Sequence, residues 1–197
     1  MSDFKKIYID IAKLHISSIE DGFLSTLGEN FLALLYESID LNPKSTLIFE
    51  SRNGSVVGFV AGGFGMGSIY FQMFKMWPRL LYTLIPSLLN PFKLKKISDI
   101  IFNNFQLNPK TSKYNNELFS ISVLKDLHGQ GVAQCLYKKL CQWFRANGVS
   151  SFKIIVGENL SRAHAFYLKM GACPVDKISV HAGNLSTLYV HELNQNN

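Results

Sequence analysis

The chain has 197 residues, of which 47% are hydrophobic and 17% charged; this excludes intrinsic disorder and allows one globular domain with a sizeable core. Its formal net charge of +6 suits a polyanionic ligand, an acidic substrate or an anionic membrane surface. No run of Lys and Arg and no basic–aromatic interleaving points to nucleic acid.

The cysteines and histidines give no metal pattern. The three cysteines lack a Cys-x-x-Cys spacing and the five histidines are scattered, so we predict no metal site. Residues 1–10 are charged and contain no apolar signal core, from which we expect a cytoplasmic location.

The first half of the chain predicts short elements in alternation. We expect a strand at residues 5–9 and a short helix at residues 10–18. A second helix should begin at Glu29 or Asn30 and end at Asn42-Pro43. Residues 46–50 and 56–61 are predicted as two strands joined by a hairpin, since Asn53 and Gly54 tolerate positive φ.

Residues 62–106 are unusually apolar. Four glycines between positions 62 and 67 suggest a flexible run, followed by two short helices broken near Pro86 and Asn90-Pro91, and by another helix at residues 94–105. Charged residues and prolines interrupt the segment, so it falls short of the roughly 20 apolar residues that span a bilayer. Extra core, a dimer face, a lid over an acceptor site and a membrane-surface element all stay open.

The stretch 117–137 predicts a strand, a tight loop and a helix. Residues 118–124 have strand character, and Val132, Leu136 and Leu140 then recur at helical spacing. Gly129 and Gly131 stand where the helix begins, and the unpaired N–H groups and dipole of a helix N-terminus favour anions. A plain tight turn is the alternative. The segment is neither a Walker loop nor a Rossmann fingerprint, because it lacks their spacings.

Two segments carry a resemblance to a known family. The loop from His128 to Ala133 resembles the Gln/Arg-x-x-Gly-x-Gly/Ala acetyl-coenzyme A loop of the GNAT superfamily, with His128 where Gln or Arg is usual. The second segment is similar to the family's Asn-x-x-Ala-x-x-Phe-Tyr-x-x-x-Gly pattern, matched by Asn159, Ala163, Phe166, Tyr167 and Gly171. Together they cover residues 117–171.

The resemblance implies a fold. It is the α/β (α+β) GNAT fold, with a mixed central sheet of about six or seven strands flanked by helices. We expect one acetyltransferase domain over residues 1–197, with residues 62–106 as a helical insertion. The remaining strands are expected at residues 151–156, 177–180 and 185–191.

The resemblance also implies an activity, the direct transfer of an acetyl group from acetyl-CoA to a primary amine of a small molecule, without a metal. The implied cofactor-binding residues are Ser122, Val123, His128, Gly129, Gln130, Gly131, Val132, Ala133 and Asn159. The implied catalytic residues are Tyr167, as the acid that protonates the leaving thiolate, and Glu117, as the base.

Each role has a plainer alternative. Asn159 could simply cap a helix, Tyr167 could be a core residue, and Glu117 could be an exposed charge at a strand start. A water relay, His181, Glu20 or Asp21 could replace the base, and we expect His164 to be packed rather than catalytic.

The whole chain has alternatives too. It could be a non-catalytic acyl-CoA-binding module, or a peripheral membrane-associated acyltransferase that uses residues 70–105. The acceptor and a homodimer both stay open.

Overall fold

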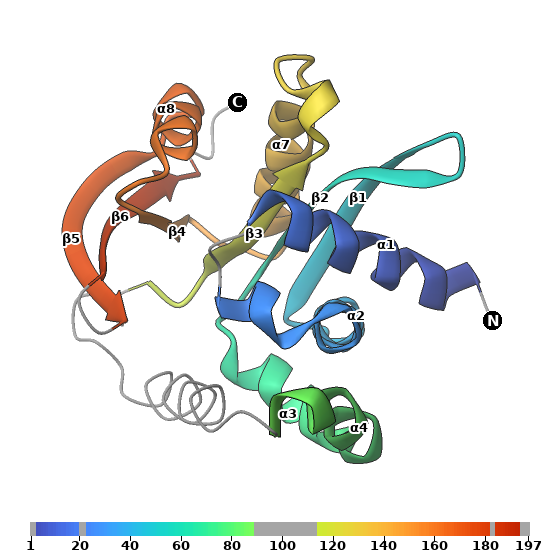
Figure 1. The fold of residues 1–197 in the computed structure, drawn as a ribbon. Coiled ribbons are helices and arrows are strands. Elements are labelled where there is room, and N and C mark those ends of the chain that lie inside the picture. The colour runs from blue at the N-terminus through green and yellow to red at the C-terminus, as the bar shows by residue number, and fades with distance from the viewer. Residues whose placement is uncertain (1–2, 20–22, 89–113, 182–183, 194–197) are drawn as a thin grey trace.

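The computed structural model describes residues 3–19, 23–88, 114–181 and 184–193. They form a mixed sheet in the order β1-β2-β3-β4-β6-β5, in which β3 and β4 are parallel and all other neighbours are antiparallel (Figure 1). The strands are β1 (Ser45–Arg52), β2 (Ser55–Gly63), β3 (Glu117–Val123), β4 (Ser151–Gly157), β5 (Cys173–His181) and β6 (Asn184–Glu192). The helices are α1 (Asp3–Ser18), η1 (Phe23–Leu27), α2 (Glu29–Asp40), α3 (Gly67–Lys75), α4 (Trp77–Leu88), η2 (Lys125–Leu127), α7 (Val132–Ala146) and α8 (Ser161–Lys169).

Helices cover both faces of the sheet. On one face, α1 and α2 pack on β1 and β2 around fully buried residues such as Ile11, Leu32 and Phe59. On the other, α7 and α8 pack on β3, β4 and β6 around Leu136, Leu140 and Phe152. The mixed sheet of six strands confirms the predicted fold class, and α2 and α7 begin where the sequence placed them.

The predicted strand at residues 5–9 is wrong, because this segment is the beginning of α1. Tyr8, Ile11, Ala12 and His15 are all buried, and their spacing of three and four residues is that of one helix face. Five residues taken alone do not separate this period from that of a strand.

The β1–β2 hairpin is formed as predicted. Its turn residues Asn53 and Gly54 have φ of 51° and 75°, and Arg52 pairs with Ser55. The flexible glycine run is wrong in part, since Gly62 and Gly63 are the end of β2. A Cβ atom on Gly63 would lie 2.6 Å from the Lys44 carbonyl oxygen, so this position requires glycine for close packing.

Residues 67–88 of the apolar segment are helical, but the break lies at Met76 instead of near Pro86. Pro78 is the second residue of α4, where a missing N–H costs nothing. Pro86 lies inside α4. The predicted helix at residues 94–105 is outside the described residues. No helix in the described parts of the chain is long and apolar enough to cross a bilayer.

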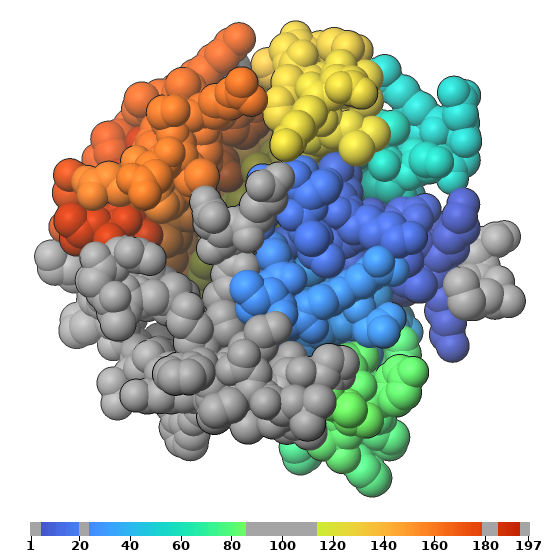
Figure 2. Space-filling model, viewed as in Figure 1, coloured from blue at the N-terminus to red at the C-terminus, as the bar shows by residue number. Residues whose placement is uncertain are grey.

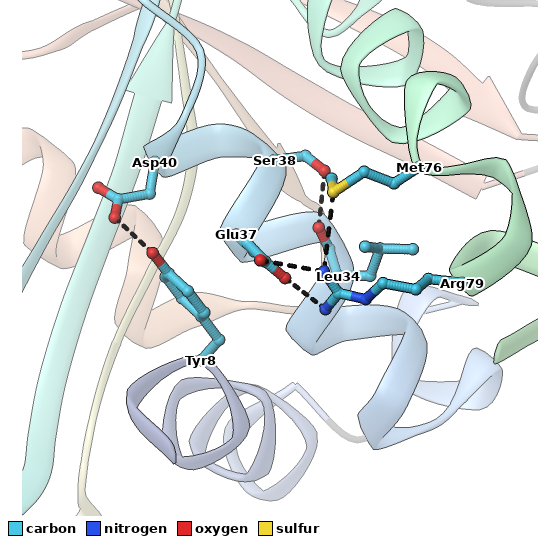
Figure 3. Close-up of polar contacts among 7 residues, drawn as sticks. All are labelled: Tyr8, Leu34, Glu37, Ser38, Asp40, Met76 and Arg79. Carbon is cyan, nitrogen blue, oxygen red and sulfur yellow. Dashed lines mark hydrogen bonds and ion pairs between the residues drawn. The ribbon is translucent and has the colours of Figure 1, made fainter. Parts of the chain in front are cut away.

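An ion pair joins α4 to α2. The Arg79 guanidinium donates to both carboxylate oxygens of Glu37, at 3.0 and 2.5 Å (Figure 3). Beside it, the Tyr8 hydroxyl donates to Asp40 at 2.7 Å, which ties α1 to the end of α2. These contacts fix the first part of the insertion against the N-terminal helices.

Candidate active site

The centre of the sheet opens between β3 and β4. Among the described residues the two strands pair at Glu117↔Lys153 and Leu118↔Ile154, whereas β3 continues along β2 as far as Val123. Beyond Leu118, therefore, no strand formed by the described residues lies beside the β4-facing edge of β3. Leu124 N–H donates to the Val57 carbonyl across the β2 side. By the alternation of an antiparallel ladder, the backbone groups of Ile121 and Val123 face the opening.

An exposed strand edge can pair with an extended ligand, as expected for the Ser122-Val123 segment. Ser122 is buried, and its hydroxyl has no hydrogen-bond partner within the described residues. The Val123 carbonyl oxygen is already engaged, because it lies 3.0 Å from Nε2 of His128, which donates to it. The edge thus retains backbone hydrogen-bonding capacity at Ile121 and at the Val123 N–H, and the Ser122 hydroxyl is a further group without a described partner.

The loop after β3 has the geometry of an anion cradle. Gly129 and Gly131 have φ of 79° and 82°, in the left-handed region that favours glycine. Gly131 is the N-cap of α7 and no side chain of the described residues caps this helix, so the N–H groups of its first turn are open. A Cβ atom on Gly129 would meet nothing within 4 Å, and one on Gly131 would meet only Gln134 Oε1 at 4.0 Å. Phosphate groups fit such a helix start, with its free N–H donors and positive dipole end.

The loop side chains hold the loop itself. Besides the contact of His128 with Val123, Nε2 of Gln130 donates to the Asp126 carbonyl oxygen at 3.0 Å. Val132, the first residue of α7, is buried, and Ala133 is half-buried. The donors left at this helix start are therefore backbone N–H groups, and His128 holds the loop through its contact with Val123.

Asn159 lies in the turn between β4 and α8. It is exposed, and the N-cap of α8 is Leu160, so the plain helix-cap interpretation of Asn159 is wrong. Its amide makes no hydrogen bond to any described residue. The turn follows Gly157 at the end of β4, the strand that borders the opening, and this leaves the amide available to a ligand there.

Tyr167 is buried on α8. Its ring packs against Tyr137 of α7 and Tyr189 of β6, with centroid distances of 6.2 Å in both cases. Burial raises the pKa of the Tyr167 hydroxyl above its ordinary value, so the group stays protonated at neutral pH. No described residue makes a hydrogen bond to this hydroxyl. A protonated, unengaged hydroxyl can act as a proton donor, but the packing equally fits a core tyrosine.

His164 fixes the position of α8. Its Nε2 donates to the Gly157 carbonyl oxygen at 3.1 Å, so Nδ1 accepts the hydroxyl proton of Tyr189 at 2.8 Å. Both ring nitrogens are thus occupied, in agreement with the expected structural role. This bridge orients the helix that carries Tyr167.

Glu117 begins β3, and its side chain is 21% exposed. Burial raises the pKa of this carboxyl, opposed by Lys153, whose Nζ lies 3.5 Å from Oε2. Tyr70 of α3 lies near enough that the Glu117 charge, added to the larger effect of burial, raises the pKa of Tyr70 to about 12. The interpretation of Glu117 as an exposed strand-start charge is therefore wrong. Sequence reasoning missed Lys153, which the alternation of β4 could have placed on this face, and Tyr70, for which it held no signal.

The sequence offered three other side chains as the base. Glu20 and Asp21 lie outside the described residues, and His181 ends β5. No group of three or more His, Cys, Asp or Glu side chains within the described ranges could hold a metal ion.

Comparison with known proteins decides the family. The sequence profile of the Acetyltransferase (GNAT) family matches residues 16–172. The chain belongs to the GNAT acetyltransferase family. The profile match includes both segments that resembled this family, the glycine loop and the segment from Asn159 to Gly171. Comparison with curated protein sequences gave no match.

Solved structures with the same fold share little sequence with this GNAT protein. An N-acetyltransferase from Staphylococcus aureus Mu50 is 14% identical with a TM-score of 0.63, covering 96% of this chain and 94% of its own. yncA from Salmonella typhimurium, solved with its cofactor acetyl-CoA, is 12% identical with a TM-score of 0.60, covering 97% and 91%. An aminoglycoside 6'-N-acetyltransferase complexed with coenzyme A is 11% identical with a TM-score of 0.59, covering 96% and 92%. At these identities the likeness establishes the fold.

Proposed function

We propose that this GNAT protein is an acetyl-CoA-dependent N-acetyltransferase that acts on a primary amine of a small molecule. The observation that carries the proposal is that the open edge of β3 and the glycine loop follow one another directly. The open edge of β3 leads directly into the loop whose glycines and uncapped helix start suit a pyrophosphate. Acetyl-CoA or coenzyme A is bound in neighbours of the same fold.

Different residues would bind different parts of acetyl-CoA. The β3 edge at Ile121 and the Val123 N–H would pair with the pantetheine arm, with the Ser122 hydroxyl as a further donor. The backbone from His128 to Ala133 would hold the pyrophosphate, and Asn159 would reach the arm from the β4 side. Acetyl-CoA, when bound, supplies the acetyl group as a thioester. Residues 1–197 would act as one domain for this purpose, in the cytoplasm.

Two side chains would handle protons. Glu117 would accept a proton from the acceptor's ammonium group, since an amine is nucleophilic only when neutral. Its raised pKa brings it closer to the basicity this task requires. Tyr167 would donate its hydroxyl proton to the departing sulfur, and its raised pKa keeps that proton available.

The test is thiol release from acetyl-CoA across a panel of primary amines, with the product identified by mass spectrometry. A matched acceptor in which a hydroxyl group replaces the amine is the control. N-acetyl products with amine-dependent thiol release would support the proposal. Tight binding of acetyl-CoA without thiol release from any amine would favour the non-catalytic acyl-CoA-binding module.

A further inference from the structure

Helices α3 and α4 are apolar on two sides. Their inner sides are buried, with Ile69 and Met73 inside the core and Leu80 and Leu84 packed against it. Their outer residues are also large and apolar, yet they are half to two-thirds exposed. We call these the outer patch: Phe71 63%, Phe74 66%, Trp77 57%, Leu81 51%, Tyr82 69% and Ile85 53%.

The helical spacing of the outer patch distinguishes it from scattered surface residues. Trp77, Leu81 and Ile85 follow one another at intervals of four and form a row along α4, and Phe71 and Phe74 are neighbours on α3. A helix on the surface of a water-soluble domain ordinarily has polar residues on its outer side. Figure 2 shows α3 and α4 at the edge of the molecule, beside α2.

The charge around the outer patch is positive on balance. The sequence contains no Asp or Glu between Glu50 and Asp99, whereas Lys75 and Arg79 lie within the two helices. Lys5 of α1 lines the same hollow of about 180 Å³ as Tyr82. Arg79 and the nearby Glu37 neutralise each other in their ion pair (Figure 3), so the excess positive charge comes from Lys75 and Lys5.

We propose that the outer patch binds the surface of an anionic lipid bilayer, with α3 and α4 lying in the interface. Exposed Trp, Tyr, Phe and Leu flanked by Lys and Arg are the composition of helices that lie in this way. A symmetric dimer through the same patch would bring the positive charges of two copies together, while the nearby carboxylate of Glu37 is already paired with Arg79. The charge pattern therefore favours an anionic partner over a second copy.

The binding would place the candidate site near lipid. Tyr70 lies on α3, the helix that bears Phe71 and Phe74, and it is close to Glu117. The amine acceptor would then be met at the bilayer surface. This last step rests on the proposed acetyl transfer, whereas membrane binding does not.

The experiment measures co-sedimentation of the full chain with phosphatidylcholine vesicles that contain or lack phosphatidylglycerol. The test variant replaces Trp77, Leu81 and Ile85 with Ser. The control variant replaces Leu41, Val175 and Leu185 with Ser, which are 55%, 50% and 49% exposed and lie elsewhere. We expect binding to anionic vesicles, weakened by salt, and a loss of roughly tenfold or more in affinity for the test variant alone.

A fluorescence readout reports on Trp77 directly. The chain has two tryptophans, so Trp143→Phe leaves Trp77 as the single reporter. Its emission should shift to the blue when anionic vesicles are added. Three results would overturn the proposal: no sedimentation with either vesicle, equal loss in both variants, or emission already blue-shifted without vesicles and unchanged by them. The last result would mean that a second copy or another part of the chain covers the patch. No acetyl-CoA is present in either assay, so their failure leaves the proposed function untouched.

Discussion

The substitution Gly131→Glu tests the cofactor cradle most directly. Gly131 caps α7 with φ of 82°, and any other residue in this left-handed conformation costs about 1–2 kcal/mol. Gly148, at the other end of the same helix, has φ of 72° and equally open surroundings. Gly148→Glu therefore adds the same strain and the same charge where no ligand is expected.

The expected magnitude follows from electrostatics. A carboxylate about 5 Å from one phosphate charge is repelled by about 3 kcal/mol at an effective dielectric constant near 20, so Kd should rise roughly 100-fold. Ligand at 100 times the original Kd stabilises the parent protein by about 2.7 kcal/mol, or roughly 5–11 °C in Tm for a domain of this size. At the same ligand concentration, the stabilisation of the Gly131→Glu variant by acetyl-CoA should fall to about 0.4 kcal/mol, or about 1–2 °C in Tm.

The assay is thermal unfolding with and without acetyl-CoA. The helix dipole favours a carboxylate at the start of α7 and disfavours one at its end, so the two variants should differ in Tm even without ligand. The quantity to compare is therefore the change in Tm that acetyl-CoA causes in each variant. Gly148→Glu should keep the full shift. Equal shifts in the two variants would show that acetyl-CoA does not use this loop.

Three further substitutions test other parts of the structure. Tyr167→Phe should lower kcat by about 10²–10⁴-fold with little change in Tm, measured by steady-state kinetics and calorimetry; a large loss of stability would instead favour a structural hydroxyl. Glu117→Gln should remove the rise of kcat/KM with pH. Because the pKa of Glu117 is raised in the folded state, its ionisation lowers the free energy of unfolding as pH increases, so Glu117→Gln should gain stability relative to the parent protein above that pKa. A pH profile of kcat/KM that is unchanged in this variant would exclude Glu117 as the base. Gly63→Ala should lower the free energy of unfolding by about 1–3 kcal/mol in urea, because its Cβ would meet the Lys44 carbonyl, while Gly67→Ala, in open space, should not; equal effects would contradict the packing.

The sequence by itself determined the features that depend on local backbone conformation. Positive φ at Asn53 and Gly54 specifies the hairpin, and left-handed glycines before a run with helical period specify the loop and the start of α7. The family also followed from the sequence, since the residues that carry it are close together in the chain. Local patterning failed for the start of α1, where a few apolar residues fit two periods.

Only the tertiary structure decided which backbone edge is open and which side chains meet. The opening exists because β3 and β4, distant in the chain, pair over two residues and then diverge. Glu117 acquires its raised pKa because elements that are distant in the chain bury it, against the opposing effect of Lys153. The sequence also did not predict that Trp77 is exposed, because a helix with apolar residues on both sides has no local pattern that shows which side is buried. Long-range packing sets burial, and burial sets both the chemistry of Glu117 and the exposure of the outer patch.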